Sequence, residues 1–202
     1  MLVRYIIVAV LGYILGSIPM GYLVVKVFKG EDVRRYGSGR TGGTNVLRAA
    51  GPWAAALTIL GDAFKGIVAV FVARVVVGAP LAEVIAGVLA VVGHNWSIFM
   101  GLRGGAGTVT NLAAMSMFSL PGAAIVVVAG FLALVISRTA SVASLVVAWL
   151  APLAFAGLAL FAHLPWVYAL YGVLSGIVVT IALRPNIARL RAGTERRLEA
   201  KY

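Results

Sequence analysis

Two glycine-rich stretches gather the side chains of this chain that are best suited to bind phosphate. Glycine lets successive backbone N–H groups turn toward one anion, and arginine adds charge-assisted, bidentate hydrogen bonds. The first stretch, residues 37–48, offers Gly37, Ser38, Gly39, Arg40, Thr44, Asn45 and Arg48. The second, residues 101–108, offers Arg103, Gly104, Gly105 and Gly107. We expect them to bind two phosphorylated ligands, or one ligand with two anionic groups.

The glycine spacing leaves two other interpretations of the first stretch. From Gly37 to Gly42 it fits the GxGxxG pattern, which indicates a dinucleotide fold only between a strand and a helix, and here it follows an apolar segment. A plain flexible turn is the other alternative, although turns seldom carry so many converging donors. The second stretch precedes an apolar segment that begins at Thr108, so free N–H groups at a helix N-terminus would face its ligand.

Several polar side chains lie within apolar segments or at their ends. Asp62 and Lys65 share one helical face and form either a structural ion pair or part of a site. His94 is either a packing residue or the candidate general base, because imidazole exchanges protons readily near neutral pH. Ser141 and Ser144 begin an apolar segment, where hydroxyls either cap the helix or bind a ligand.

Other kinds of chemistry find no matching residues. The chain has no cysteine, which excludes disulfides, thiolate catalysis and cysteine-based metal sites. It shows no HExxH motif, no paired carboxylates and no obvious Ser-His-Asp set. We therefore expect neither a metal nor any other cofactor.

Helices that cross a membrane must position these residues. Hydrophobic residues make up 62% of the chain and charged residues only 11%, whereas soluble domains carry about 25% charged residues. Apolar runs lie at residues 2–26, 53–77, 82–100, 108–137, 141–161 and 165–183, and a span needs ~20 such residues. We expect an all-α, polytopic integral membrane helical bundle, with residues 1–202 forming a single membrane-embedded domain.

The distribution of positive charge predicts the topology. The chain has 17 Lys and Arg against 6 Asp and Glu, a net charge of +11. In a soluble protein this would suggest nucleic acid as a partner, but here the cations lie in short loops and the tail, which indicates the positive-inside rule instead. We expect no nucleic-acid partner.

A turn at Ser119 to Gly122 would divide the 108–137 run into segments 108–119 and 122–137. Fourteen of the 17 Lys and Arg are then cytoplasmic; Arg4 and Arg74 lie outside, and Lys65 lies within a span. The prediction is about seven transmembrane segments, with the N-terminus outside and the C-terminus in the cytoplasm. Segment 108–119 is short, so it either spans the membrane or is re-entrant.

Seven short motifs occur in order along the chain. They are GSIP at 16–19, GSGRTGGTNVLR at 37–48, GDAFKG at 61–66, GH at 93–94, GLRGGAGT at 101–108, RTASVAS at 138–144 and RPNIARLRAGTE at 184–195. Over nearly the whole chain this series resembles the bacterial acyl-phosphate:glycerol-3-phosphate acyltransferase family, PlsY. The resemblance implies a seven-helix enzyme of the cytoplasmic membrane whose active site faces the cytoplasm. Such an enzyme makes lysophosphatidic acid from acyl phosphate and glycerol 3-phosphate in phospholipid synthesis, and no obligate protein partner is expected.

The resemblance also implies which residues bind substrate. They are Ser38, Thr44, Asn45, Arg48, Asp62, Lys65, His94, Ser141, Ser144 and Asn186. Three positions depart from the family pattern: Ala106 stands where a lysine is usual, Arg40 where an asparagine is usual, and Leu183 where a histidine is usual. Arg40 could supply the missing charge from the opposite loop; otherwise the departures change the substrate or the activity.

Acyl phosphate is already activated, so the residues favour direct attack by the sn-1 hydroxyl of glycerol 3-phosphate without an acyl-enzyme. Ser38 and Arg48 are expected to act in catalysis by holding phosphate, while His94 or the departing phosphate takes the hydroxyl proton. One alternative is a divergent relative with another phosphorylated acceptor or with no activity. The other is a small anion transporter, which would need a polar path through the bilayer midplane.

Overall fold

The structure is a computed structural model that describes residues 1–198, and all the regular elements in that range are helices. They are α1 (Leu2–Ser17), α2 (Met20–Lys29), η1 (Val33–Arg35), α3 (Gly43–Val76), α4 (Pro80–Asn95), η2 (Ile98–Met100), α5 (Thr108–Phe118), α6 (Leu120–Ser137), α7 (Ala140–Phe161), α8 (Val167–Ala182) and α9 (Arg184–Arg191). The expected all-α fold is thus confirmed over the described residues.

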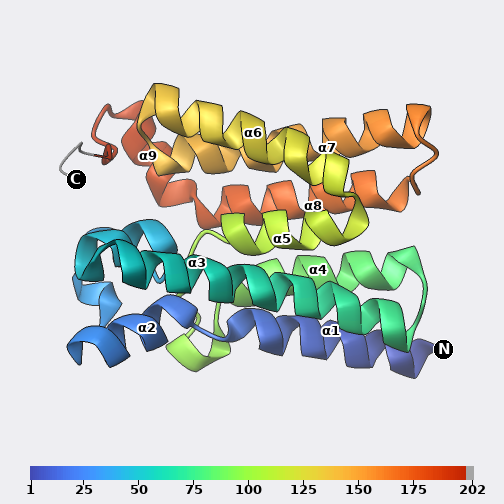
Figure 1. Cartoon of the computed structure of the whole chain (residues 1–202), viewed down its shortest axis with the longest axis horizontal. Helices are drawn as coiled ribbons and strands as arrows, with labels where there is room; N and C mark the ends of the chain where they lie inside the picture. Colours follow the sequence, from blue (N-terminus) through green and yellow to red (C-terminus); the bar gives the residue numbers. More distant parts are fainter. Residues whose placement is uncertain (199–202) are drawn as a thin grey trace.

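The long helices run side by side along one direction, as Figure 1 shows. α1 packs against α3 and α4, α4 continues the layer to α8, and α7 joins α8 to α6. The short α5 lies between α3 and α6 and begins part-way along the bundle (Figure 1). The N-terminus lies at one end of the bundle, and α2, α9 and the start of α3 lie at the other.

The helices have the length and polarity of membrane spans. Five stretches of helix are long and apolar enough to cross a membrane, and α8 with α9 makes a sixth if this pair, bent by 66°, counts as one span. Large apolar side chains such as Ile136 and Phe161 are more than 80% exposed, as is typical of surfaces that face lipid. An integral membrane bundle is confirmed, with five to six candidate spans among the described residues. α5 has 11 residues, about 16 Å of helix, and is too short to cross alone.

The expected turn near Ser119 is present. α5 ends at Phe118, and the Ser119 hydroxyl accepts a hydrogen bond from the Gly122 N–H over 3.2 Å, which caps the start of α6. The 108–137 run therefore consists of two helices, as the sequence predicted.

Two helix boundaries differ from the apolar runs. The run 2–26 is broken between α1 and α2 at Pro19, since proline has no N–H to continue the hydrogen-bond ladder. α3 begins at Gly43, before its apolar part, and bends at Gly51, whose φ of 83° lies in the left-handed region, next to Pro52. Thr44, Asn45 and Arg48 consequently belong to a helix, whereas the sequence placed them in a loop.

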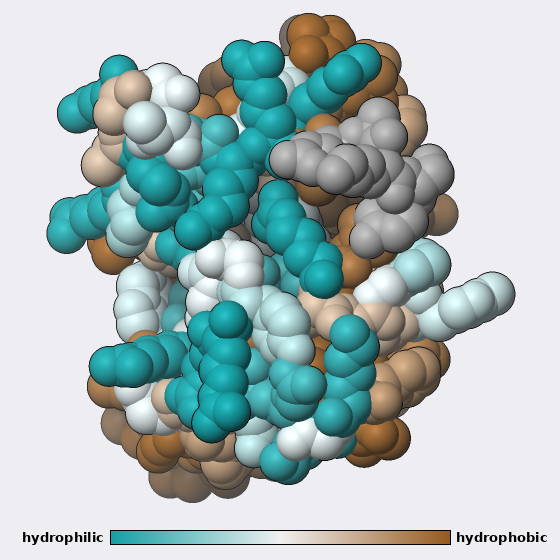
Figure 2. Space-filling model, turned by 90° about the vertical axis from the view of Figure 1, so that its left-hand side faces the viewer, coloured by the Kyte–Doolittle hydropathy of each residue, from teal (hydrophilic) through white to brown (hydrophobic). Residues whose placement is uncertain are grey.

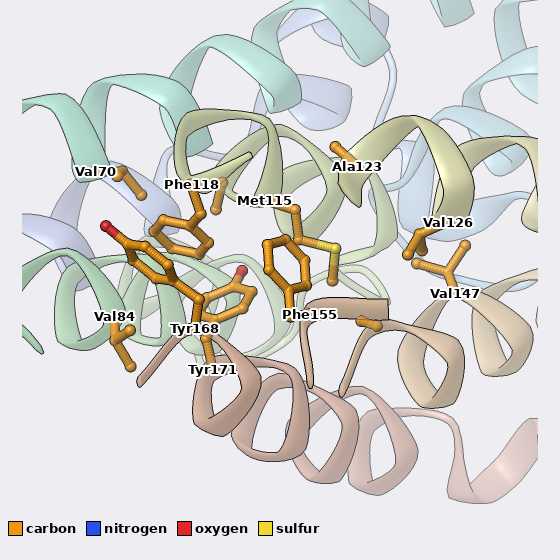
Figure 3. Close-up of a cluster of buried hydrophobic side chains, with 12 residues drawn as sticks. Val70, Val84, Met115, Phe118, Ala123, Val126, Val147, Phe155, Tyr168 and Tyr171 are labelled. Atoms are coloured by element: carbon orange, nitrogen blue, oxygen red, sulfur yellow. The ribbon is translucent and has the colours of Figure 1, made fainter. Parts of the chain in front are cut away.

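An aromatic cluster joins the two halves of the bundle (Figure 3). Phe118 at the end of α5 stacks on Tyr168 of α8 with ring centroids 4.6 Å apart, and meets Tyr171 edge-on at 4.7 Å. The Tyr171 hydroxyl donates to Asn111 Oδ1 of α5 over 2.7 Å. These contacts hold α5 in place, and its N-terminus is thereby directed at the site described next.

Candidate active site

A cavity of about 270 Å³ opens near the end of the bundle that carries α2 and α9. Three helices begin at its wall: α3 at Gly43, α5 at Thr108 and α7 at Ala140. Each N-terminus presents unpaired N–H groups and a partial charge of about +0.5. Three such ends around one cavity make a strong anion site.

The start of α7 was expected to matter only through its serines. Neither serine caps the helix, because the N-cap Thr139 is followed by a first turn without a side-chain cap. Ser144 instead accepts a hydrogen bond from the Thr108 hydroxyl over 2.7 Å and donates to the Ala140 carbonyl over 2.8 Å. The sequence did not mark Thr108 as a site residue, although it begins α5 and lines the cavity.

Asn45 organises the first glycine stretch. Its Nδ2 donates to the carbonyls of Val33 and Arg40 over 3.0 and 2.8 Å, and its Oδ1 accepts from the Ser38 N–H over 3.0 Å. The side chain is 2% exposed and its polar atoms are all occupied. Asn45 therefore fixes the shape of the loop that carries Ser38. Its amide atoms are already hydrogen-bonded, so few donors or acceptors remain to bind a ligand.

Two arginines of the first stretch line the cavity. Arg48 is exposed, and no hydrogen bond to another residue within 1–198 engages its guanidinium, so its donors can reach an anion. Arg40 is half-buried and donates to the carbonyls of Gly105 and Ala182. The two glycine stretches therefore meet directly, as the hypothesis about Arg40 requires.

A buried polar cluster lies beneath the cavity. Lys65 Nζ is 2.9 Å from Asp62 Oδ1 and also donates to the Ile18 carbonyl over 2.8 Å, at the break between α1 and α2. Lys65 thus adds a second hydrogen bond to a carbonyl that also accepts from the Met20 N–H over 3.1 Å. Asp62 and Lys65 form the structural ion pair that the sequence left open, and Lys65 does not line the cavity.

His94 lines the cavity but is only 5% exposed. Its Nδ1 lies 3.4 Å from Asp62 Oδ1 and 3.3 Å from the Thr110 hydroxyl. A Cβ at Gly105 would lie 2.1 Å from His94 Nε2, so only glycine lets the second stretch pass over the ring. This packing explains why residue 105 is glycine. At Gly104, likewise, an added Cβ would lie 1.9 Å from the His94 carbonyl oxygen.

The segment after α9 supplies an acid that the sequence analysis did not single out. Glu195 accepts hydrogen bonds from Asn186 Nδ2 over 2.7 Å and from the Ser141 hydroxyl over 3.3 Å, and it pairs with Arg189 over 2.7 Å. Glu195 and the exposed Arg196 both line the cavity. The carboxylate therefore orients two of the predicted binding side chains.

The cavity gathers most of the predicted site residues. Those that line it are Ser38, Arg40, Thr44, Asn45, Arg48, Asp62, His94, Gly107, Ser141, Ser144 and Asn186. Those that do not are Gly37, Gly39, Lys65, Arg103, Gly104 and Gly105. Figure 2 looks onto this end of the molecule and shows hydrophilic side chains gathered across it, with hydrophobic ones toward the rim. All three departures, Arg40, Ala106 and Leu183, line the same cavity.

Comparison with known proteins identifies the family. A sequence model described as "Glycerol-3-phosphate acyltransferase" matches residues 6–193. The chain belongs to the glycerol-3-phosphate acyltransferase family. This confirms the resemblance, the function and the enzyme class expected from the sequence: acyl transfer to glycerol 3-phosphate, with lysophosphatidic acid as product.

The similarity to individual acyltransferases extends over the whole fold. The chain is 40% identical over 199 residues to glycerol-3-phosphate acyltransferase 2 of Moorella thermoacetica, covering 96% of this chain and 97% of the relative. It is 41% identical over 194 residues to the enzyme of Symbiobacterium thermophilum, covering 96% and 94%. A crystal structure of PlsY (YgiH), an integral membrane glycerol 3-phosphate acyltransferase in its glycerol 3-phosphate form, aligns with a TM-score of 0.86 at 30% identity over 96% of both chains. A second form of that protein, with lysophosphatidic acid, aligns with a TM-score of 0.85 at 27% identity over 96% of this chain and 95% of that one.

Proposed function

We propose that this acyltransferase takes the acyl group from acyl phosphate and that both substrates meet in the cavity at the starts of α3, α5 and α7. The observation that carries the proposal is the convergence of three helix N-termini with Arg40 and Arg48 on one cavity. Two dianionic phosphates need that much positive potential. Ser38, Thr44 and Arg48 would bind phosphate from the α3 side, and Ser141, Ser144 and Asn186 from the opposite side.

The chemistry is direct acyl transfer. The sn-1 oxygen of glycerol 3-phosphate attacks the acyl carbonyl carbon, a new ester C–O bond forms, and the acyl–phosphate C–O bond breaks with its electron pair on the phosphate. Helix N–H groups and arginine hold both phosphates and stabilise the charge on the leaving group, which is catalysis by positioning and electrostatic preorganisation.

The hydroxyl proton passes to the departing phosphate in this proposal. His94 is the imidazole that lines the cavity, but its Nδ1 faces Asp62 and Thr110, and the second stretch passes so close to its Nε2 that a Cβ at Gly105 would lie 2.1 Å from that atom. A phosphate oxygen, in contrast, is necessarily close to the reacting carbon. His94 then keeps the second glycine stretch in position instead of acting as the base.

We also propose that the whole chain works as one membrane-embedded domain of the cytoplasmic membrane. Its N-terminus lies outside, its C-terminus and cavity face the cytoplasm, and seven segments enter the bilayer, with α5 reaching only part-way across the bundle. The hydrophilic side chains gathered at the cavity end (Figure 2), with Arg40, Arg48 and Arg196 in the cavity wall, support this orientation. Because the chain has no cysteine, single cysteines can report the topology. Cysteines at Arg35 and Arg191 should react only when the inner face is accessible, and those at Ala79 and Leu120 from outside; the reverse pattern would invert the orientation.

The activity is tested with purified protein, acyl phosphate and glycerol 3-phosphate. The proposal predicts lysophosphatidic acid and inorganic phosphate in equal amounts, and no phosphate release when glycerol 3-phosphate is omitted. A stoichiometric burst of phosphate without the acceptor would instead indicate an acyl-enzyme. A protein that forms no lysophosphatidic acid under these conditions would contradict the proposed donor.

A further inference from the structure

Arg40 carries a half-buried positive charge without a carboxylate partner. Both hydrogen bonds of its guanidinium go to backbone carbonyls, Gly105 from the second glycine stretch and Ala182 at the end of α8. None of the ion pairs formed among residues 1–198 includes Arg40. Glu195 acts on Arg40 electrostatically, but its carboxylate is already paired with Arg189 over 2.7 Å.

Such a charge is costly in the apo protein. Removing a guanidinium from water is unfavourable unless an opposite charge or good hydrogen bonds compensate, and neutral carbonyls compensate only in part. Burial lowers the pKa of Arg40, Arg189 lowers it further, and Glu195 opposes the change. A guanidinium has five N–H donors, and two hydrogen bonds to the protein are formed here, so donors are left over for a ligand.

The position of Arg40 determines which part of the cavity it serves. Gly105 lies two residues before Gly107 and three before Thr108, where α5 begins, and both Gly107 and Thr108 line the cavity beside Arg40. The free N–H groups at the start of α5 and the Arg40 guanidinium therefore border the same volume. Ala106 and Leu183, which line this part of the wall, contribute no charge.

We infer that Arg40 is the counter-ion for a phosphate monoester bound at the N-terminus of α5, a subsite separate from the one that Arg48 serves at α3. The inference rests on the proposed function, because acyl phosphate and glycerol 3-phosphate both carry such a group. Arg40 also links three walls of the cavity, so charge and cross-linking have to be separated experimentally.

A substitution at Ala106 can separate the charge of Arg40 from its role as a cross-link between the cavity walls. Ala106 adjoins the Gly105 carbonyl that Arg40 contacts, it is partly exposed, and it lines the cavity. A lysine there can return a cation to the same subsite, but it does not restore the hydrogen bond from residue 40 to Ala182. Rescue by Ala106→Lys therefore reports charge, whereas a purely structural role of Arg40 predicts no rescue.

The test compares wild type, Arg40→Gln, Ala106→Lys and the double variant. KM is measured for each substrate in turn, and the Kd of inorganic phosphate is measured on the same purified proteins. Arg40→Gln should raise the KM of the substrate whose phosphate occupies the subsite, and the phosphate Kd, about ten- to hundredfold. Adding Ala106→Lys should recover most of that loss, while Ala106→Lys alone should not improve wild type, a non-additive cycle.

The controls separate the possible failures. Arg35→Gln removes an exposed arginine of the same segment that does not line the cavity, and it should leave both KM values unchanged. Thermal unfolding of Arg40→Gln shows whether the variant is folded; if it is not, Arg40→Met, which is neutral and of similar length, replaces it in the cycle. Additive effects, or unchanged KM and Kd in the Arg40 variant, overturn the inference. A wild type that binds phosphate through Arg40 but makes no lysophosphatidic acid would instead contradict the proposed function and leave the subsite standing.

Discussion

Asn186 donates a hydrogen bond from its Nδ2 to Glu195 Oε1 over 2.7 Å, and this contact fixes which face of the amide points away from the acid. An ionised carboxylate only accepts hydrogen bonds, so the Asn186 Oδ1 is turned away from Glu195. The Glu195 carboxylate also accepts a hydrogen bond from the Ser141 hydroxyl and pairs with Arg189. Two side chains on the α7–α9 side of the cavity therefore depend on one acid.

Glu195→Gln should lower kcat/KM about tenfold, because a neutral amide weakens the pairing with Arg189 and lets the Asn186 amide rotate. Steady-state kinetics with both substrates provide the measurement. Glu31→Gln, at an exposed acid that does not line the cavity, is the matched control and should retain full activity. Equal activity of the two variants would show that Glu195 does not position the site.

Gly105→Ala should reduce kcat at least tenfold while the protein remains folded. A Cβ at this position would lie 2.1 Å from His94 Nε2, so either the ring or the glycine stretch has to move, and the start of α5 moves with it. Gly157→Ala is the control, because a Cβ there meets no atom within 4 Å. Full activity of Gly105→Ala would mean that the second stretch is more tolerant than its packing indicates.

The sequence predicted the helical bundle and most of the cavity-lining residues, but it did not predict which partners their polar side chains bind. Glycine and arginine patterns marked the two stretches, and Ser119-Leu120-Pro121-Gly122 marked the turn between α5 and α6, because these signals are local. The partners of Asn45, Lys65 and Glu195 depend on contacts between residues far apart in the chain. Residue type alone could not show that backbone groups occupy the Asn45 amide, or that Lys65 binds Asp62 and the Ile18 carbonyl. For the same reason the start of α3 was missed: residues 43–51 are too polar to belong to an apolar run, although they continue its helix across the bend.

His94→Ala tests where the proton goes. If the departing phosphate accepts the proton, kcat should still fall, because the packing beneath Gly105 is loosened. The shape of the kcat–pH profile should nevertheless match that of wild type between about pH 5 and 9. Rates are measured at saturating concentrations of both substrates. Loss of a limb of the profile in the variant would identify imidazole as the base.

Arg48→Lys should raise the KM of one phosphorylated substrate about tenfold with a smaller change in kcat. An ammonium keeps the charge but cannot reproduce the bidentate fork that the free Arg48 guanidinium offers an anion. Arg35→Lys is the matched control, since this exposed arginine lies outside the cavity lining. An unchanged KM for both substrates would remove Arg48 from the phosphate site.

A comparison of two donors shows whether the enzyme takes the acyl group from acyl phosphate. Purified wild-type protein is given radiolabelled glycerol 3-phosphate with either acyl phosphate or acyl-CoA of the same chain length, and labelled lysophosphatidic acid is quantified. The cavity of about 270 Å³ is lined by residues suited to bind phosphate groups. It is too small to hold a nucleotide headgroup together with the acceptor. We predict rapid product formation with acyl phosphate and little with acyl-CoA; equal or faster formation with acyl-CoA would contradict the account.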